Sequence, residues 1–216
     1  MNMQQARFNM IEQQIRPWDV LDHSVLQVMM DLPRDAFVSE AQQSLAYADI
    51  QLPIGHGESM MHPRVEGRIL QELAIQDDDI CLEIGTGSAY LTACMANLAK
   101  EVFTVELHED FIATAEQRLA AQNISNVILE QADALQNLDL DKRYDVIAVT
   151  GSIPEYLPLF EQLLKPEGRL YITVGSGALQ YAMLIVNSDG KYIRSNLFAT
   201  ELDPLQGATT QSSFRF

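Results

Sequence analysis

The feature that most limits the possible folds is a change of pattern near residue 80. From there the chain alternates short apolar runs with amphipathic stretches, beginning with ICLEI at 80–84. That first run is too short for a helix and ends at a glycine, so we predict a strand. Apolar strands that alternate with helices indicate a mostly parallel sheet with helices on both faces. The sequence therefore predicts an α/β fold with a doubly wound sheet.

Five parallel strands and the helices between them follow from this pattern. The predicted strands are ICLEI at 80–84, EVFTVE at 101–106, NVILEQ at 126–131, YDVIAVT at 144–150 and RLYITVG at 169–175. The predicted helices cover about 88–98, 111–119 and 154–164. Two further strand-like runs flank Asp189-Gly190, a pair typical of hairpin turns, so we expect a C-terminal antiparallel hairpin at one edge of the sheet.

The first 79 residues have a different character, because their apolar residues recur at helical spacing. Three helices are predicted, within QQARFNMIEQQI at 4–15, DHSVLQVMMDL at 22–32 and PRVEGRILQELA at 63–74. We therefore predict an N-terminal helical subdomain over 1–79 and a sheet domain over 80–216.

Length and composition suit a cytoplasmic globular protein. The chain has 216 residues, of which 47% are hydrophobic, and no apolar run approaches the roughly 20 residues of a membrane span. The first residues lack the pattern of a signal peptide. Cys81 and Cys94 lie in apolar segments and form no CxxC pair, so we expect buried free thiols in a reducing compartment. No membrane partner is expected.

The charge of the chain argues against nucleic acid as a partner. Lys and Arg number 14 against 30 Asp and Glu, which gives a net charge of −16. A surface this acidic repels phosphate backbones.

A glycine-rich turn follows the first predicted strand and indicates a ligand site. Gly85 and Gly87 lie where a backbone can approach a ligand closely. The dinucleotide pattern GxGxxG would need glycine at Tyr90, which argues against NAD. Glu83 precedes the first glycine, and its carboxylate would discourage a pyrophosphate but suits a cationic ligand.

Two more acids follow the next two strands. Glu106 ends the second strand, where an acid can accept hydrogen bonds from ribose hydroxyls, and Asp133 follows the third, where it can accept from an adenine amino group. A helix-capping acid and a turn aspartate are the ordinary alternatives. Open α/β sheets bind ligands at this edge, so the three acids together describe an adenosine that carries a positive charge and no phosphate. The ligand that fits is S-adenosylmethionine.

The motifs also resemble a known family. LEIGTGSAYLTA, VELHED, YDVIAVT and LLKPEGRLYITVG look like successive motifs of Rossmann-like class I methyltransferases. Together with DLPRDAFV and AYADIQLPIGHGESMMHP, they resemble the protein-L-isoaspartate O-methyltransferase family over about residues 10–205. The resemblance implies methyl transfer from S-adenosylmethionine to the free carboxylate of L-isoaspartyl residues in damaged peptides or proteins, a repair reaction that leaves S-adenosylhomocysteine.

The resemblance also implies the residues of the site. The acceptor-facing serine of the family matches position 61, and Ser59, two residues earlier, is the candidate to stand in for it. The candidates for holding the cofactor are Glu83, Gly85, Thr86, Gly87, Glu106, Leu107, Asp133 and Ala134, with Met60 and Met61 from a loop that covers the cofactor.

This loop departs from the family pattern on its acceptor side. Met61 stands where the family has a serine whose hydroxyl faces the acceptor, and Ala89 stands where it has a third glycine. A thioether donates no hydrogen bond, so we expect isoaspartyl methylation to be slow or absent while the cofactor still binds. A methyltransferase with another acceptor, or a non-catalytic S-adenosylmethionine-binding protein, therefore stays open as an alternative.

The histidines of the same loop do not indicate a different chemistry. His56 and His62 are six residues apart, with no cysteine or aspartate nearby to complete a metal-ligand set, so no metal is expected. A Ser-His nucleophile pair lacks a recognisable acid partner and nucleophile elbow.

Overall fold

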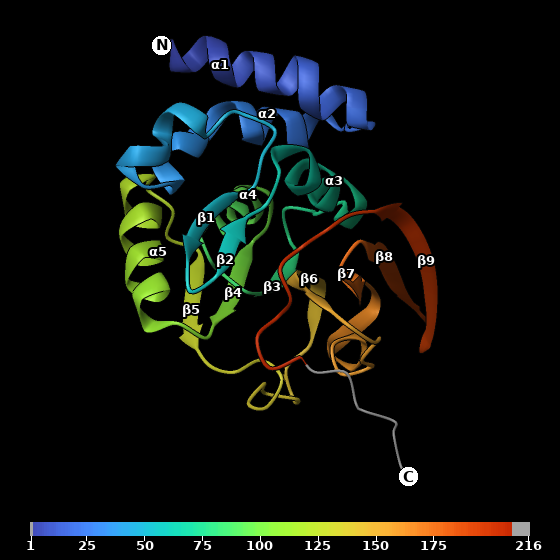
Figure 1. Cartoon of the computed structure of the whole chain (residues 1–216). Coiled ribbons are helices and arrows are strands. Elements are labelled where there is room, and N and C mark those ends of the chain that lie inside the picture. The colour runs from blue at the N-terminus through green and yellow to red at the C-terminus, as the bar shows by residue number, and fades with distance from the viewer. Residues whose placement is uncertain (1, 209–216) are drawn as a thin grey trace.

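A seven-stranded sheet forms the centre of the protein (Figure 1). The computed structural model describes residues 2–208. The strand order is β5-β4-β3-β6-β7-β8-β9, in which β5 to β7 run parallel and β8 and β9 pair antiparallel to their neighbours. The strands are β3 (Ile80–Ile84), β4 (Glu101–Glu106), β5 (Val127–Gln131), β6 (Tyr144–Ile153), β7 (Leu164–Ser176), β8 (Leu179–Ser188) and β9 (Lys191–Ala199). The predicted fold class and C-terminal hairpin are confirmed.

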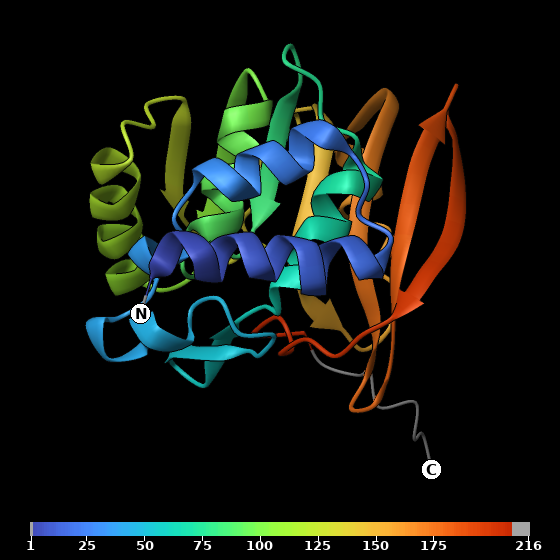
Figure 2. The same ribbon diagram turned by 90° about the horizontal axis from the view of Figure 1, so that it is seen from above.

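Helices cover one face of this sheet in two layers (Figure 2). The α-helices are α1 (Met3–Met10), α2 (His23–Asp31), α3 (Pro63–Leu73), α4 (Tyr90–Leu98) and α5 (Glu109–Ala121). Shorter helical turns are η1 (Ile11–Ile15), η2 (Arg16–Trp18), η3 (Arg34–Phe37), η4 (Glu40–Leu45) and η5 (Glu161–Leu163). The α3 and α4 helices lie next to the strands, and α1 and α2 lie outside them. No helix in the described range 2–208 is long and apolar enough to cross a membrane.

The alternation of side chains along each strand produces two hydrophobic cores. Cys81 and Val146 belong to the core beneath the helices, whereas their neighbours Leu82 and Ile147 belong to the core on the opposite face. Successive side chains of a strand point to opposite faces, so strands that are apolar throughout must be covered on both. The helix-covered core also contains residues of α2 and α3, so the N-terminal segment and the sheet bury their side chains together.

The helix expected over 154–164 is absent, and without it the described α-helices pack on one face of the sheet, whereas the sequence predicted helices on both faces. Only the short turn η5 forms there, and β7 already begins at Leu164. Pro158 explains the difference, because a proline in a helix interior removes a backbone hydrogen bond and clashes with the preceding turn. The other face of the sheet is therefore covered here by a loop and by Phe160 and Leu163.

A small β-hairpin interrupts the N-terminal segment, where the sequence pattern indicated only a loop. Its strands are β1 (Leu52–Gly55) and β2 (Glu58–Met60), paired antiparallel. His56 and Gly57 form the turn with φ angles of 51° and 80°, a left-handed conformation that glycine adopts easily. This hairpin is the segment expected to cover the cofactor. We call it the lid hairpin.

Both cysteines are buried and free, as predicted. Burial raises the pKa of each thiol well above its usual value, so neither is a reactive thiolate at neutral pH.

Candidate active site

Two neighbouring cavities lie where β3, β4 and β6 end, and together they contain all the predicted site residues. The first is lined by Gln51, Ile54, Glu58, Ser59, Met60, Met61, Glu66, Glu83, Gly85, Thr86, Gly87, Ser88, Leu91, Thr150, Gly151, Leu202, Asp203, Pro204 and Leu205. The second is lined by Glu58, Ile84, Gly85, Val105, Glu106, Leu107, Ala132, Asp133, Ala134, Leu135, Leu205 and Gln206. Glu58, Gly85 and Leu205 border both cavities, so a ligand longer than either one can extend across them.

The glycine turn after β3 brings the backbone close to its surroundings at two positions. A Cβ atom on Gly85 would lie 2.4 Å from Thr150 Oγ1, and one on Gly87 would lie 3.0 Å from Ile54 Cδ1. Both glycines also have positive φ angles, of 94° and 49°. A side chain at Gly85 would collide with Thr150 of β6, and one at Gly87 would press on the end of the Ile54 side chain, so close packing and the positive φ angles both favour glycine here.

The position of the missing third glycine retains the glycine-like backbone. Ala89 has φ 66° and ψ 11° and is the residue immediately before α4. A left-handed conformation costs a non-glycine residue energy, so the turn keeps its shape at some expense of stability.

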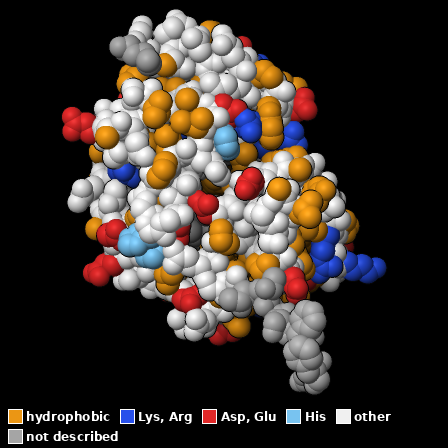
Figure 3. Space-filling model, viewed as in Figure 1, with side chains coloured by type: hydrophobic (Ala, Val, Ile, Leu, Met, Phe, Trp, Pro, Cys, Tyr) orange, Lys and Arg blue, Asp and Glu red, His pale blue; other side chains and the backbone are white. Residues whose placement is uncertain are grey.

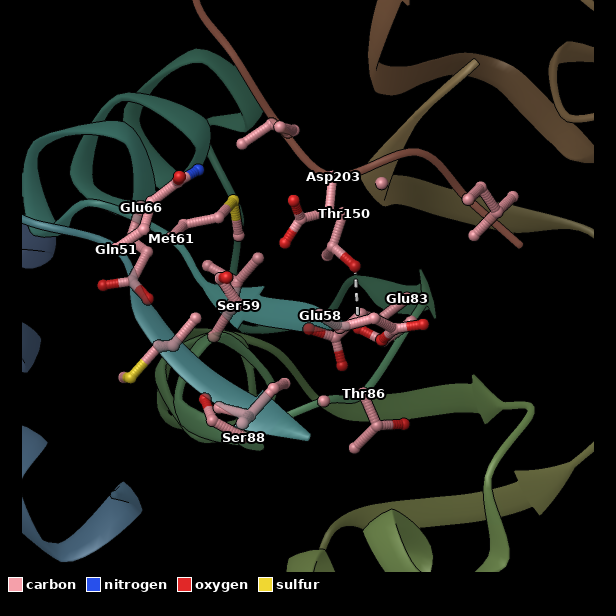
Figure 4. A pocket seen from close by; sticks show the side chains of 18 of the residues that line it. Gln51, Glu58, Ser59, Met61, Glu66, Glu83, Thr86, Ser88, Thr150 and Asp203 are labelled. Carbon is pink, nitrogen blue, oxygen red and sulfur yellow. Dashed lines mark hydrogen bonds between the residues drawn. The ribbon is translucent and has the colours of Figure 1, made fainter. Parts of the chain in front are cut away.

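Glu83 is a buried carboxyl group with one oxygen free (Figure 4). Its Oε2 accepts hydrogen bonds from Thr92 and, at 2.7 Å, from Thr104 Oγ1. Its Oε1 has no hydrogen-bond partner among the described residues, and Glu83 lines the first cavity. Burial raises the pKa of Glu83 to about 8, although the two hydroxyl hydrogen bonds act in the opposite direction. The group is therefore suited to receive a cationic ligand that would stabilise its ionised form.

The carboxylate of Glu106 organises the end of β4. Its Oε2 accepts a hydrogen bond from the Gly87 amide at 2.9 Å, and its Oε1 accepts from the Leu107 and His108 amides at 2.8 and 3.0 Å. A carboxylate offers about four acceptor positions, so about one remains on Oε2. The sequence predicted an acceptor for both ribose hydroxyls. The geometry offers one direct acceptor position unless a backbone amide is displaced.

Asp133 lies beside the second cavity after β5. Its Oδ1 accepts from the Leu135 amide at 2.9 Å and its Oδ2 from Gln136 Nε2 at 2.6 Å. It is therefore both a turn aspartate and a cavity residue. Ala134 and Leu107 line the same cavity.

A buried ion pair holds the base of the lid hairpin. Arg34 has no exposed surface, and its Nε lies 3.0 Å from Glu66 Oε2. The same guanidinium donates to the carbonyl oxygens of Met61 and Ala46, at 2.5 and 2.7 Å. Its bond to the Met61 carbonyl fixes the chain at the end of the hairpin, next to the first cavity.

The lid side chains named from the sequence do reach the first cavity. Ser59, Met60 and Met61 all line it, and Figure 4 shows the hairpin passing beside Glu83 and Thr86. Ser59 is half-buried in β2, where it pairs with Pro53 of β1.

Thr150 and Asp203 are cavity residues that the sequence analysis missed. Thr150 ends the predicted fourth strand, and its Oγ1 lies 2.8 Å from the carbonyl oxygens of Ile84 and Gly85. The rule that located Glu106 and Asp133, that ligands lie at the carboxyl ends of strands, also covers Thr150. Asp203 follows β9 and reaches the site through pairing with β6, for which the sequence shows no local signal.

The two lid histidines considered as metal ligands are engaged with different partners. His56 Nε2 lies 3.0 Å from both carboxylate oxygens of Asp110, and His62 Nδ1 lies 3.2 Å from Asp49 Oδ1. His56 also stacks on His108 with ring centroids 3.8 Å apart.

Comparison with known proteins decides the family. Residues 5–208 match the model of the protein-L-isoaspartate(D-aspartate) O-methyltransferase family. The chain belongs to this family. It is 33% identical to the protein-L-isoaspartate O-methyltransferase of Koribacter versatilis, over 93% of this chain and 90% of that protein. It is 37% identical to the enzyme of that name from Pseudomonas aeruginosa, over 84% of this chain and 86% of that protein.

A solved structure agrees with the fold. A protein-L-isoaspartate O-methyltransferase of Plasmodium falciparum, in complex with S-adenosyl-L-homocysteine, superimposes with a TM-score of 0.81. The match covers 95% of this chain and 99% of that chain at 21% sequence identity, so it supports the fold. The family, the enzyme class and the fold predicted from the motifs are confirmed.

Proposed function

We propose that the protein is an S-adenosylmethionine-dependent O-methyltransferase that acts on the carboxylate of L-isoaspartyl residues in damaged peptides or proteins. Membership in the family supports this activity. The two joined cavities link this activity to particular residues, because together they contain every predicted cofactor residue.

The residues present fit this cofactor. The free Glu83 Oε1 offers an acceptor for the cationic methionine end, and the closely packed Gly85 lets a ligand pass along the backbone. Glu106 and Asp133 offer acceptors at the adenosine end. When bound, S-adenosylmethionine supplies a methyl group on a sulfonium centre.

On the acceptor side, the main task of the protein is to orient the acceptor carboxylate toward the methyl group. A carboxylate is already ionised at pH 7, so its methylation requires no general base, and alignment of the reactants supplies most of the acceleration. Ser59 lines the first cavity and is our candidate for orienting the acceptor. Methylation turns the carboxylate into an ester that can lose methanol. The adjacent amide nitrogen then attacks the ester carbonyl carbon, the carbon–methoxy bond breaks with the amide proton leaving in methanol, and a succinimide closes, which begins the repair.

The partner is therefore a peptide or protein, and not nucleic acid, which the net charge of −16 disfavours. We place the enzyme in the cytoplasm, without a membrane partner, because its two cysteines are free and buried.

The test of the acceptor is a substitution in the lid hairpin. We expect Met61→Ser to raise methylation of an isoaspartyl peptide by about tenfold, because it restores one hydrogen-bond donor to a charged acceptor. The measurement is S-adenosylhomocysteine release with one synthetic isoaspartyl peptide. Met60→Ser is the matched control, since Met60 lines the same cavity at the neighbouring position, and no gain is expected there. Strong wild-type activity that drops in Met61→Ser would show that the serine is dispensable, and inactivity in both would favour another acceptor.

Cofactor binding should depend on pH through Glu83. With a pKa of about 8, this carboxyl is mostly protonated at pH 7, and a cationic ligand favours its ionised form. Binding should therefore release a proton below pH 8, and the affinity should rise as pH increases from 6.5 to 8.5. Titration calorimetry in two buffers with different protonation enthalpies measures the proton count. In Glu83→Gln this release should disappear, and a wild-type affinity that falls with rising pH would contradict the assignment.

A further inference from the structure

A cluster of metal-ligating side chains lies at the turn of the lid hairpin. His56 from the turn meets His108, which immediately precedes α5, and Asp110 from the first turn of that helix. Each side chain offers one ligand atom, and these atoms all lie within 4.8 Å of one another. Asp110 follows His56 by 54 residues, so local spacing in the sequence does not reveal the set. Figure 3 shows histidine side chains at the surface of this face, with acidic side chains close by.

The contacts within this cluster are close to those of a metal site. His56 Nε2 lies 3.0 Å from both carboxylate oxygens of Asp110, and the His56 and His108 rings stack with centroids 3.8 Å apart. Zinc binds nitrogen and oxygen at about 2.0–2.2 Å, so the ligand atoms of a tetrahedral site lie roughly 3.4 Å apart. The lone pair of an imidazole nitrogen lies in the plane of its ring, so the His56 ring must turn out of the stack to share an ion with His108. Its side chain is 40% exposed, which leaves room for that rotation.

The ligand types and the local charge favour a transition-metal ion. Two imidazoles and a carboxylate, with water in the fourth position, suit Zn²⁺, whereas Mg²⁺ and Ca²⁺ prefer oxygen ligands. Glu58 adds a second carboxylate, whose Oε1 lies 3.6 Å from His108 Nε2. The N-terminus of α5 opposes a cation, but Glu109 and Asp110 in its first turn offset this effect.

Gln206 is the neighbour that competes for the same nitrogen. Its Nε2 lies 3.0 Å from His108 Nε2 and donates to Glu58 Oε1 at 2.7 Å. An ion on His108 Nε2 replaces the first of these contacts and leaves the second in place. The amide of Gln206 therefore keeps an acceptor when the ion binds.

We propose that His56, His108 and Asp110 bind one divalent transition-metal ion of the Zn²⁺ class, which fastens the lid hairpin to the start of α5. The three residues lie outside the set that lines the two cavities of the active site, so the role of the ion is to hold the lid. The His108 amide donates to Glu106 Oε1 at 3.0 Å, so the ion connects the hairpin turn to the end of β4. The hairpin then cannot lift from the cavities without breaking a metal–ligand bond. This site goes beyond the proposed methyl transfer and does not depend on it.

Titration calorimetry of chelator-treated protein with ZnCl₂ at neutral pH tests the site. We expect one ion per chain in wild type and at least about a hundredfold weaker binding in His56→Asn and in His108→Asn, since even an outer-shell partner contributes about 10–100-fold to metal affinity. Asparagine tolerates the left-handed backbone of His56 and suits the cap position of His108, so both variants should keep the fold. His62→Asn is the matched control, because His62 pairs with Asp49 and its loss should leave zinc binding unchanged.

Magnesium distinguishes this site from a general attraction of cations to surface acids. About a hundredfold excess of MgCl₂ should leave zinc binding unchanged, because Mg²⁺ prefers oxygen ligands. Displacement of zinc by Mg²⁺, equal binding in wild type and the two variants, an equal loss in His62→Asn, or no binding in wild type would each overturn the site.

Amide hydrogen exchange over residues 52–60 tests whether the ion fastens the lid hairpin. Saturating zinc should slow this exchange at least about tenfold in wild type, because opening must then release the ion, and should leave it unchanged in His108→Asn. Zinc binding without slower exchange would overturn the fastening. None of these measurements uses S-adenosylmethionine, so a failure here is distinct from a failure of the proposed function.

Discussion

Replacing Arg34 with alanine is expected to lower the free energy of unfolding by about 3–5 kcal/mol, because the change leaves a buried charge without its partner. Arg34 is fully buried, and its Nε lies 3.0 Å from Glu66 Oε2. The substitution also removes the donors to the carbonyl oxygens of Ala46 and Met61. Urea denaturation followed by circular dichroism measures the loss.

A matched control shows whether the loss of stability comes from the burial of the ion pair or from the loss of any ion pair. Arg16 pairs with Glu12 on the surface, where their side chains are 45% and 38% exposed, and such pairs contribute about 0–1 kcal/mol. Arg16→Ala should therefore change stability little. A double variant, Arg34→Met with Glu66→Leu, removes both charges and should recover much of the loss, since well-packed apolar replacements of buried pairs are often neutral. If Arg34→Ala costs less than Arg16→Ala, the pair does not hold the base of the lid hairpin.

The residues that we propose for the cofactor could be predicted from the sequence because one rule of topology brings them together. Parallel strands all end at the same edge of a sheet, so residues that end successive strands meet in space although 20 or more residues separate them. Glu83, Glu106 and Asp133 were predicted in this way, and they line the two joined cavities. Thr150 obeys the same rule and could have been named with them.

The acceptor side was harder to predict because long-range tertiary contacts bring its residues together. Such contacts leave no local pattern in the sequence. Asp203 reaches the cavity through the pairing of Pro204 with Ser152, about 50 residues earlier in the chain. Arg34 and Glu66 lie in separate elements, and nothing in the sequence indicates that their charges are buried together. Hydrophobic periodicity reports which residues face a core, but not which polar residues meet inside it.

The two sides of the site therefore differ in how far they follow the family. The glycine turn, Glu83 and Glu106 are the residues that we propose to hold the cofactor. Met61 leaves the acceptor side without the donor that a serine would supply. Met61→Ser restores the donor and should therefore raise isoaspartyl methylation.

Glu106→Ala is expected to weaken S-adenosylmethionine binding by about a hundredfold, the upper part of what one hydrogen bond to a charged acceptor contributes. The loss is large because this carboxylate does two things. Its Oε2 keeps an acceptor position for a ribose hydroxyl, and both oxygens hold the amides of Gly87, Leu107 and His108 at 2.8–3.0 Å. Without it the glycine turn is no longer tied to the end of β4. Titration calorimetry with S-adenosylmethionine measures the change, and Glu109→Ala, an exposed glutamate in the first turn of α5, is the control that should bind normally. If Glu106→Ala binds the cofactor as tightly as Glu109→Ala does, the second cavity is not the ribose site.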